Sequence, residues 1–357
     1  MTIDAFKYAA LPSEVIFGAG VLEQVSGQLA NRGYRRALVL CTPEQREQAE
    51  RVAQLLGSVA VGIHDKAVMH VPIEVAREAI NRAAELSADC AVAIGGGSTI
   101  GLGKAIALES SIPIVAIPTT YAGSEMTPIY GLTEGGVKRT GRNIRVLPKL
   151  VLYDPRLTLT LPVALSVTSG VNAIAHAVEG LYASDRNPVL SLMAEEGIRA
   201  IASALPRLTI DGLDVGAREE CLYGAWLCGT VLGSTSAALH HKLCHTLGGT
   251  FNLPHAETHT IVLPHAVAYN QRSAPDAMKR IARALGSSDA ATGLWDLAKA
   301  CGAPLALRDI GMPRDGISIA AKLALANPYA NPREITLDGI TALLSHAWAG
   351  DRPSPSS

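Results

Sequence analysis

The sequence has almost no net charge, because 31 lysines and arginines are balanced by 32 aspartates and glutamates over 357 residues. A formal charge of -1 gives no general attraction for nucleic acid or for an anionic membrane. An anionic substrate would therefore have to be held by local cationic groups. Charged residues make up only 18% of the chain and apolar residues 48%, which is typical of a globular enzyme and not of a disordered chain.

Cysteine patterning and targeting signals are also missing. The six cysteines include no CxxC pair and no framework spacing, so we expect reduced core residues. The first residues, MTIDAFKYAALPSEVIF, lack the basic start and apolar run of a signal peptide. The uncharged stretch between Glu220 and Lys242 has the length of a membrane span, but three glycines interrupt it and no basic flank marks an orientation. We therefore expect a buried helix, a cytoplasmic protein, and neither a membrane nor a nucleic-acid partner.

The length corresponds to about two domains, and the two halves differ in their sequence pattern. Up to about residue 157, short apolar runs such as RRALVLC, VAVGIH, DCAVAI, IPIVAIP and KLVLYDP alternate with amphipathic stretches. Continuous apolar runs are typical of a parallel sheet buried on both faces, and alternation with helices predicts a doubly wound α/β domain over 1–157. The alanine- and leucine-rich remainder predicts an all-α domain over 158–357.

A glycine turn follows one predicted strand in ADCAVAIGGGSTIGLGKAIAL. Gly95, Gly96 and Gly97 would let a ligand approach the backbone, and the N-terminus of the helix that starts near Ser98 suits a pyrophosphate. The segment is not the Rossmann fingerprint, because Ile100 stands at the third glycine, and it is not a P-loop. A tight turn without a ligand is the alternative.

A second predicted strand, in IPIVAIPTTYAGSEMTPIY, is followed by hydroxyl side chains and a glycine. Open α/β sheets bind ligands at the carboxyl ends of their strands, so two such ends in one sheet predict a dinucleotide site. The residues that we expect to bind the cofactor are Thr42, Gly95, Gly96, Gly97, Ser98, Thr99, Thr119, Thr120, Ser124 and Thr127.

Six of the ten histidines fall between residues 240 and 265. His241 and His245 are four residues apart and would share a helix face, as would Asn172 and His176. We expect His255 at a helix start, because it follows Leu253-Pro254. The spacing leaves metal binding and metal-free proton chemistry both open, although the missing HExxH disfavours a zincin protease. His240, His259 and His265 are left without a role, and His64, His70 and His346 are interpreted as ordinary core or surface residues.

Four segments resemble the landmarks of iron-containing (group III) alcohol dehydrogenases, in that family's order and spacing: GGGSTIGLGKAIAL, IPTTYAGSEMT, NAIAHAVEG and HHKLCHTLGGTFNLPHAETHTIVLPHAVAYN. The resemblance implies a dehydroquinate synthase-like architecture, with a Rossmann-like dinucleotide-binding domain and a helical domain. It also implies an active site between the two domains and a homodimer.

The metal-bearing members of this family use an aspartate and three histidines as ligands. Carried over by resemblance, these former ligand positions are Asn172, His176, His241 and His255, and His245 matches a histidine close to the substrate. Asn172 departs from the pattern, because an amide replaces the only anionic ligand. Hard cations such as Fe(II) would lose most from this change, whereas three histidines alone can still hold zinc.

The IGLGKAIAL continuation, Asn172 and HHKLCH resemble one branch of the family, whose members reduce maleylacetate to 3-oxoadipate with NADH or NADPH. Hydride addition to its C=C bond would give an enolate, which hydrogen-bond donors can stabilise without a Lewis acid. We therefore expect catalysis by His241 and His245, substrate orientation by Asn172, His176 and His255, and no required metal. Lys242, Lys138 and Arg142 are candidates for binding the two substrate carboxylates.

Thr42 follows the strand RRALVLC, where NAD-preferring relatives carry an aspartate. Without that carboxylate a 2′-phosphate is not repelled, so we expect weak discrimination between NADH and NADPH. The closest rival interpretation is a metal-dependent alcohol or polyol dehydrogenase of the same family. A nucleotide-binding protein without catalysis would not be expected to keep four histidines, and a hydrolase leaves the glycine turn unexplained.

Overall fold

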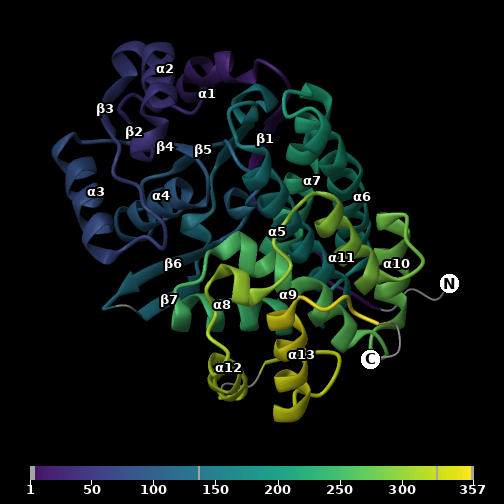
Figure 1. Ribbon diagram of the computed structural model, residues 1–357. Helices are drawn as coiled ribbons and strands as arrows, with labels where there is room; N and C mark the ends of the chain where they lie inside the picture. The colour runs from purple at the N-terminus through teal and green to yellow at the C-terminus, as the bar shows by residue number, and fades with distance from the viewer. Residues whose placement is uncertain (1–4, 136, 327–328, 355–357) are drawn as a thin grey trace. The chain divides into compact units, whose positions relative to one another are not determined.

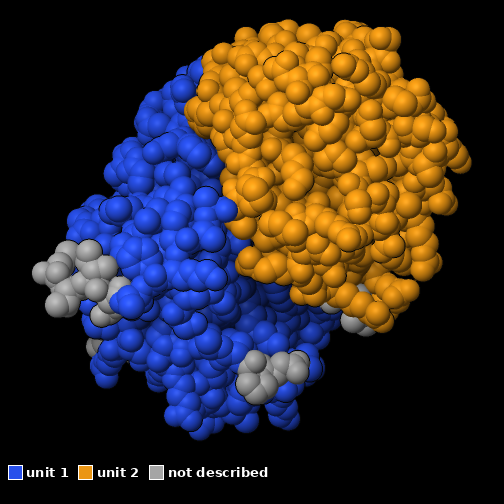
Figure 2. Space-filling model, turned by 180° about the vertical axis from the view of Figure 1, so that it is seen from behind, with its two compact units in different colours: residues 1–10, 162–357 blue, residues 11–161 orange. Residues whose placement is uncertain are grey.

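The computed structural model describes residues 5–135, 137–326 and 329–354. Residues 11–161 form one compact unit, and residues 1–10 with 162–357 form another (Figure 2). The first holds a parallel six-stranded sheet with helices and the second is helical throughout its described part (Figure 1). The predicted fold class is therefore confirmed.

The sheet of the α/β unit has the strand order β1-β8-β5-β4-β2-β3, and all its pairs are parallel. Its strands are β1 (Glu14–Phe17), β2 (Ala37–Leu40), β3 (Ala60–His64), β4 (Cys90–Gly95), β5 (Ile114–Pro118) and β8 (Leu150–Tyr153). The helices between them are α1 (Val25–Asn31), α2 (Arg46–Leu56), α3 (Ile73–Glu85) and α4 (Gly97–Ser110). Every apolar run that predicted a strand forms one.

Helices cover both faces of this sheet. Val92 and Ile94 of β4 face a core that includes residues of α1 and α2. Ala93 faces the other way, where Gly103 of α4 approaches it so closely that a Cβ on the glycine would lie 3.6 Å from the alanine Cβ. Burial on both faces is the physical reason for the continuous apolar runs of the sequence.

An antiparallel hairpin that the sequence pattern did not predict follows β5. It consists of β6 (Ile129–Glu134) and β7 (Val137–Arg142), and Gly135 turns between them with a φ of 57°. Neither strand has a continuous apolar run, because β6 is only half-buried, so the pattern that predicts parallel strands does not detect it.

The helical unit is built around α5 (Val163–Tyr182), which contacts α6, α7 and α9. Helix α8 packs on α9, so segments far apart in the sequence meet around α5 and α9. The remaining bounds are α6 (Pro188–Ile210), α7 (Val215–Ser234), α8 (Leu239–Phe251), α9 (His255–Asn270), α10 (Pro275–Leu285), α11 (Ala290–Ala300), α12 (Gly316–Leu325) and α13 (Leu337–Ala349).

The uncharged stretch after Glu220 forms the larger part of α7, which ends at Ser234 before the chain turns into α8. Its glycines serve packing, since a Cβ on Gly224 would lie 2.5 Å from Ile201 of α6. Among the described helices, none is long and apolar enough to span a bilayer.

Candidate functional site

The glycine turn lies at a change of direction in the sheet topology. From β2 the chain adds β3 on one side, and it then adds β4, β5 and β8 on the other. The carboxyl ends of β2 and β4 therefore flank a topological switch point, where open α/β sheets bind their ligands. Leu40 pairs with Ala93 and Gly95 pairs with Pro118, so three strand ends meet at this edge.

Each of the three positions in the turn carries glycine for a different physical reason. Gly95 has a φ of 151°, and a Cβ there would lie 2.5 Å from Gln45 Oε1 and from Thr99 Oγ1. A Cβ on Gly96 would lie 2.9 Å from Thr120 Cγ2. At Gly97 the nearest atom would be 3.9 Å away, so packing within the described protein does not require a glycine there. An open first residue of α4 is what a ligand at the helix N-terminus needs.

Gln45, which sequence reasoning missed, links the side chains around the turn. Its Nε2 donates to Thr119 Oγ1 at 2.7 Å, and Thr42 Oγ1 donates to its Oε1 at 3.4 Å. Thr42 precedes a 3₁₀ turn, Pro43–Gln45, and its side chain makes no capping bond. Its hydroxyl faces glutamine instead.

The remaining expected cofactor residues differ in how their hydroxyls are used. Ser98 and Thr99 lie in the first turn of α4, and Thr99 Oγ1 is buried without a hydrogen-bond partner in the described structure. Thr120 is half-buried beside Gly96. The hydroxyls of Ser124 and Thr127 instead lie 3.2 Å and 2.9 Å from Lys104 Nζ, in the same unit.

In the helical unit, the expected histidines come from three helices. Asn172 and His176 lie four residues apart on α5, His241 and His245 lie four apart on α8, and His255 begins α9. These placements agree with the spacing argument. The packing of α5 and α8 on α9 then brings the first three of these residues together.

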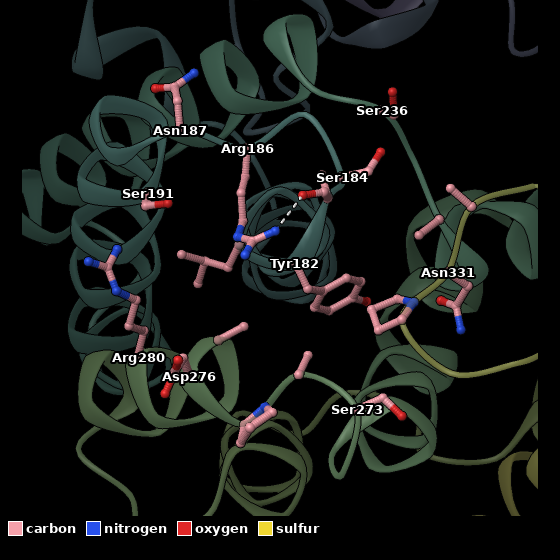
Figure 3. Close-up of a pocket in the computed structure, with 18 of the residues that line it drawn as sticks. Tyr182, Ser184, Arg186, Asn187, Ser191, Ser236, Ser273, Asp276, Arg280 and Asn331 are labelled. Atoms are coloured by element: carbon pink, nitrogen blue, oxygen red, sulfur yellow. Dashed lines mark hydrogen bonds between the residues drawn. The ribbon is translucent and has the colours of Figure 1, made fainter. Parts of the chain in front are cut away.

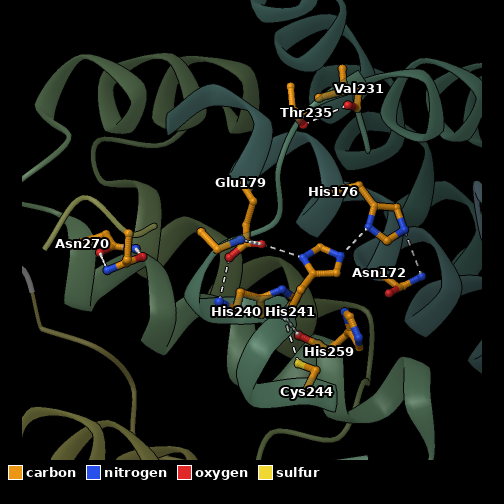
Figure 4. Close-up of polar contacts among 12 residues, drawn as sticks. Asn172, His176, Glu179, Val231, Thr235, His240, His241, Cys244, His259 and Asn270 are labelled. Carbon is orange, nitrogen blue, oxygen red and sulfur yellow. Dashed lines mark hydrogen bonds and ion pairs between the residues drawn. The ribbon is translucent and has the colours of Figure 1, made fainter. Parts of the chain in front are cut away.

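A chain of hydrogen bonds joins the buried members of this set (Figure 4). Asn172 Nδ2 lies 3.5 Å from His176 Nε2, and His176 Nδ1 lies 2.9 Å from His241 Nε2. His241 Nδ1 lies 2.7 Å from Oε2 of Glu179, which stands one turn after His176 on α5. The chain therefore runs from an amide through two imidazoles to a carboxylate.

The direction of the donors in this chain follows from the carboxylate. Glu179 also accepts backbone N–H groups from Ala238 at 2.8 Å and from His240 at 2.7 Å, so both its oxygens act as acceptors. We assign Nδ1–H to His241, which leaves its Nε2 to accept from Nδ1–H of His176. Every link then donates toward Glu179, and both rings are neutral.

Burial disfavours the charged forms of the groups in this network, so it raises the pKa of the carboxyl group and lowers the pKa of the imidazoles. It raises the pKa of Glu179, an effect opposed by His240 and by the backbone N–H groups. It lowers the pKa of His241 to about 4, so the imidazole is neutral near pH 7. Glu179 was missed from the sequence, although an acid in the otherwise apolar NAIAHAVEG is a usable signal.

His240 and His259 also belong to this cluster, although nothing in their sequence positions favoured them over other histidines. Among the described residues, the group of three donors close enough to hold a metal ion is His240, His241 and His259, whose ligand atoms lie within 4.8 Å of one another. Burial lowers the pKa of His240 to about 3 and that of His259 well below its usual value. Both ring nitrogens of His259 are buried without hydrogen-bond partners in the described structure.

The remaining expected residues are more accessible. His245 is exposed and His255 is half-buried, whereas His176 and His241 are each 5% exposed. Lys242 is half-buried, and its Nζ lies 5.7 Å from the ring centroid of Tyr329. Arg142 is exposed on β7 of the other unit. The side chain of Lys138 lies outside what the structure describes.

One large cavity of the helical unit is lined by a different set of residues (Figure 3). It has a volume of about 1040 Å³, and the residues around it include Tyr182, Arg186, Asp276 and Arg280. None of the expected site residues lines it. Volume alone therefore does not identify the functional site.

Comparisons with known proteins cover nearly the whole chain. Residues 12–155 match the model of the family described as iron-containing alcohol dehydrogenase, and residues 166–348 match the C-terminal model of the Fe-containing alcohol dehydrogenase family. Maleylacetate reductase of Burkholderia cepacia is 62% identical over 352 residues, which is 99% of this chain and 100% of that protein.

Solved structures give the same picture. The crystal structure of maleylacetate reductase from Agrobacterium tumefaciens superposes with a TM-score of 0.95 at 51% identity, covering 98% of this chain and 100% of that one. That of an iron-containing alcohol dehydrogenase from Corynebacterium glutamicum superposes with a TM-score of 0.94 at 42% identity, covering 99% of each chain.

Proposed function

Because the chain belongs to the iron-containing alcohol dehydrogenase family, we propose that it reduces maleylacetate to 3-oxoadipate with NADH or NADPH. The observation that carries this proposal is the 62% identity to the Burkholderia cepacia maleylacetate reductase over 99% of the chain. The reaction belongs to the breakdown of aromatic compounds, and we propose a cytoplasmic homodimer as its setting.

The proposed reaction transfers a hydride from the nicotinamide to the alkene carbon β to the ketone. The electron pair of the C=C bond moves toward the ketone oxygen and gives an enolate, and NAD(P)⁺ is left. A proton then adds to the neighbouring carbon, so one NAD(P)H and one proton are consumed for each double bond reduced. The protein has two tasks: to stabilise charge on the enolate oxygen and to supply the proton.

The cofactor is proposed to bind at the glycine turn, with its pyrophosphate at the N-terminus of α4. The open position at Gly97 supports this, because no protein atom lies within 3.9 Å of a Cβ built there. Thr42 at the end of β2 offers a hydroxyl instead of a carboxylate to the adenosine ribose, which supports use of both NADH and NADPH.

We propose that His245 is the imidazole that contacts the enolate oxygen. It is exposed, whereas both ring nitrogens of His241 are in hydrogen bonds to His176 and Glu179. In this proposal His241 is the second catalytic imidazole, and its ring centroid lies 6.2 Å from that of His245. His176, His255 and Asn172 orient the substrate in this proposal.

The two substrate carboxylates require cationic partners. Lys242 follows His241 on α8, and its half-buried position supports it as the first candidate. Arg142, which is exposed, and Lys138 on the same strand β7 are the weaker candidates.

The family name implies iron, but the donor set at the former ligand positions fits a tightly held hard cation poorly. Asn172 supplies an amide, and its Oδ1 is buried without a partner in the described structure. The nearby carboxylate, Glu179, already accepts three N–H groups. Without an anionic ligand, Fe(II) loses its main charge compensation. We therefore propose turnover that does not require a metal.

A second candidate function is a metal-dependent alcohol dehydrogenase of the same family. The neutral, mutually close donors of His240, His241 and His259 favour it, and three imidazoles can hold zinc. The 42% identity to the iron-containing alcohol dehydrogenase of Corynebacterium glutamicum points in the same direction.

One experiment separates the two candidates. Purified protein is treated with a chelator, analysed for metal, and mixed with NADH and maleylacetate while nicotinamide absorbance is followed. We expect turnover at full rate without metal, and no oxidation of simple alcohols with NAD⁺ before or after addition of Zn²⁺ or Fe²⁺. Loss of maleylacetate reduction on chelation, with recovery on adding metal, would contradict the metal-free proposal.

A further inference from the structure

Lys104 is a fully buried cation in the α/β unit. It stands in the third turn of α4, the helix that begins at the glycine turn, and it is 1% exposed. Its Nζ lies 2.7 Å from the carbonyl oxygens of Ser124 and Ile129 and 2.9 Å from Thr127 Oγ1. Ser124 Oγ is a fourth, longer contact at 3.2 Å, so all three N–H donors of an ammonium group have an acceptor.

The acceptors all belong to one segment, residues 119–129, which follows β5 and ends at the start of β6. This segment also packs on the glycine turn, because the N–H of Thr119 donates to the carbonyl of Gly95 at 3.1 Å. The side chain of Thr120 lies against Gly96, where a Cβ would come within 2.9 Å of Thr120 Cγ2. The segment is therefore held at one end by the glycine turn and at the other by Lys104.

The cation has few charged neighbours. Glu125, in the 3₁₀ turn Ser124–Met126, is the described charged group that acts on it, and Glu125 Oε1 accepts from Tyr153 of β8 at 2.7 Å. Burial lowers the pKa of Lys104 to about 7, and Glu125 opposes this change. A neutral amine has only two N–H donors, so it can donate to no more than two of these acceptors at once.

We propose that Lys104 is a positioning residue for the cofactor site, which holds segment 119–129 in the shape that NAD(P)H binds. The ammonium joins α4 to the segment, so the helix N-terminus and the hydroxyls of Thr119 and Thr120 keep one geometry. The proposal rests on the proposed function only in taking NAD(P)H as the ligand of the glycine turn.

A lysine that served folding alone would affect stability and leave the affinity of the folded protein for cofactor unchanged. A positioning residue changes the dissociation constant of NADH and its KM, with a smaller change in kcat, because it acts on binding in ground and transition states alike. The pH dependence of NADH binding gives a second readout, since the three-donor form of Lys104 is lost as pH rises through about 7.

The experiment measures NADH binding by fluorescence titration, with no second substrate, at pH values from about 6 to 8.5. Lys104→Met keeps length and apolar volume but removes the donors. Lys149→Met, at an exposed lysine of the same unit, is the matched control. Thr127→Val removes one acceptor and Thr127→Ser retains it. Circular dichroism and thermal unfolding show whether each variant is folded.

We expect Lys104→Met to raise the dissociation constant for NADH about fivefold or more at pH 6.5, with kcat within about twofold of the wild type. Thr127→Val should give a smaller loss that Thr127→Ser restores, which preserves the test if Lys104→Met does not fold. Wild-type affinity should fall as pH rises, and Lys104→Met should remove this dependence, whereas Glu125→Gln should retain it.

Equal NADH affinity in folded Lys104→Met and wild type would overturn the inference. So would a pH dependence that Lys104→Met retains and Glu125→Gln abolishes. Failure of the proposed function looks different: the wild type would bind neither NADH nor NADPH, or it would bind them and leave maleylacetate unreduced.

Discussion

His241 and Glu179 form the last link of a one-directional hydrogen-bond chain, with 2.7 Å between Nδ1 and Oε2. The chain also contains Asn172 and His176, so it begins at an amide and ends at a carboxylate. A carboxylate that accepts from a catalytic imidazole fixes its tautomer and its ring orientation.

Glu179→Gln should lower kcat for maleylacetate by about 10- to 100-fold with a smaller effect on KM. In either orientation the amide NH₂ of the glutamine faces a backbone N–H of Ala238 or His240, so unfolding should also become easier by about 1–3 kcal/mol. Steady-state kinetics and urea unfolding measure the two effects.

The control for this change is Glu196→Gln, which removes an exposed carboxylate that pairs with Arg199. It should alter stability by at most about 1 kcal/mol and leave kcat unchanged. Glu179→Asp, which keeps the charge, should retain more activity than Glu179→Gln. Equal kcat in Glu179→Gln and wild type would remove the tautomer argument.

Asn172→Asp restores the carboxylate that the metal-bearing relatives use. We expect it to bind Zn²⁺ or Fe²⁺ at least about tenfold more tightly than the wild type, because an anionic ligand compensates the charge of the cation. Calorimetric titration of chelator-treated protein measures the affinity directly. Asn172→Ala removes the amide without adding charge and should gain no affinity; a wild type that already holds one ion per chain after dialysis speaks against this account.

Gly97 and Gly95 should respond differently to alanine. Gly97→Ala adds a Cβ that meets no protein atom within 3.9 Å, so the thermal midpoint should be retained while the KM for NADH rises severalfold. Gly95→Ala adds a Cβ 2.5 Å from two side-chain oxygens at a φ of 151°, so it should destabilise the fold by about 1–3 kcal/mol. Thermal unfolding with NADH titration compares the two, and equal stability losses would show that Gly97 is needed for packing.

Thr42 should determine how strongly the protein discriminates between NADH and NADPH. The wild type should use NADH and NADPH with kcat/KM values that differ by less than about a hundredfold, because no carboxylate repels a 2′-phosphate. Thr42→Asp should reduce kcat/KM for NADPH at least about tenfold and affect NADH much less. A wild-type preference for NADH above a hundredfold would mean that another group excludes the phosphate.

The free energy of unfolding should fall as pH is lowered below about 6.5. Burial holds the pKa of His240 at about 3 and those of His241 and His265 at about 4, so the unfolded chain binds protons that the folded chain does not. The contribution of these neutral rings to the free energy of unfolding is fully present above the pKa of histidine in the unfolded chain. It is lost as pH falls toward the pKa values in the folded protein. Each such histidine contributes a slope of about 1.4 kcal/mol per pH unit.

Urea unfolding at about pH 7.5, 6 and 5 measures this slope. His265→Gln should reduce the slope of the free energy of unfolding against pH by the contribution of one histidine, and it leaves the cluster around His241 unchanged. A free energy of unfolding that stays constant between pH 7 and 5 would show that the buried rings accept protons without cost.

Sequence pattern alone determined the strand–helix order, the glycine turn and the helical spacing of Asn172 with His176 and of His241 with His245. These are local properties: periodicity, glycine and capping positions act within a few residues of the chain. The sequence pattern did not predict the β6–β7 hairpin, because β6 is only half-buried and the hairpin lacks the continuous apolar run of a buried strand.

Only the tertiary structure brought Glu179, His240 and His259 into the histidine cluster, Gln45 to the glycine turn and Lys104 to the segment that follows β5. Each of these side chains contacts partners that are distant in the sequence; Glu179 and His241, for example, are 62 positions apart. Which residues meet depends on how α5, α8 and α9 pack and on which strand ends adjoin. Burial in those packed positions, and not residue type alone, then determines which groups carry charge.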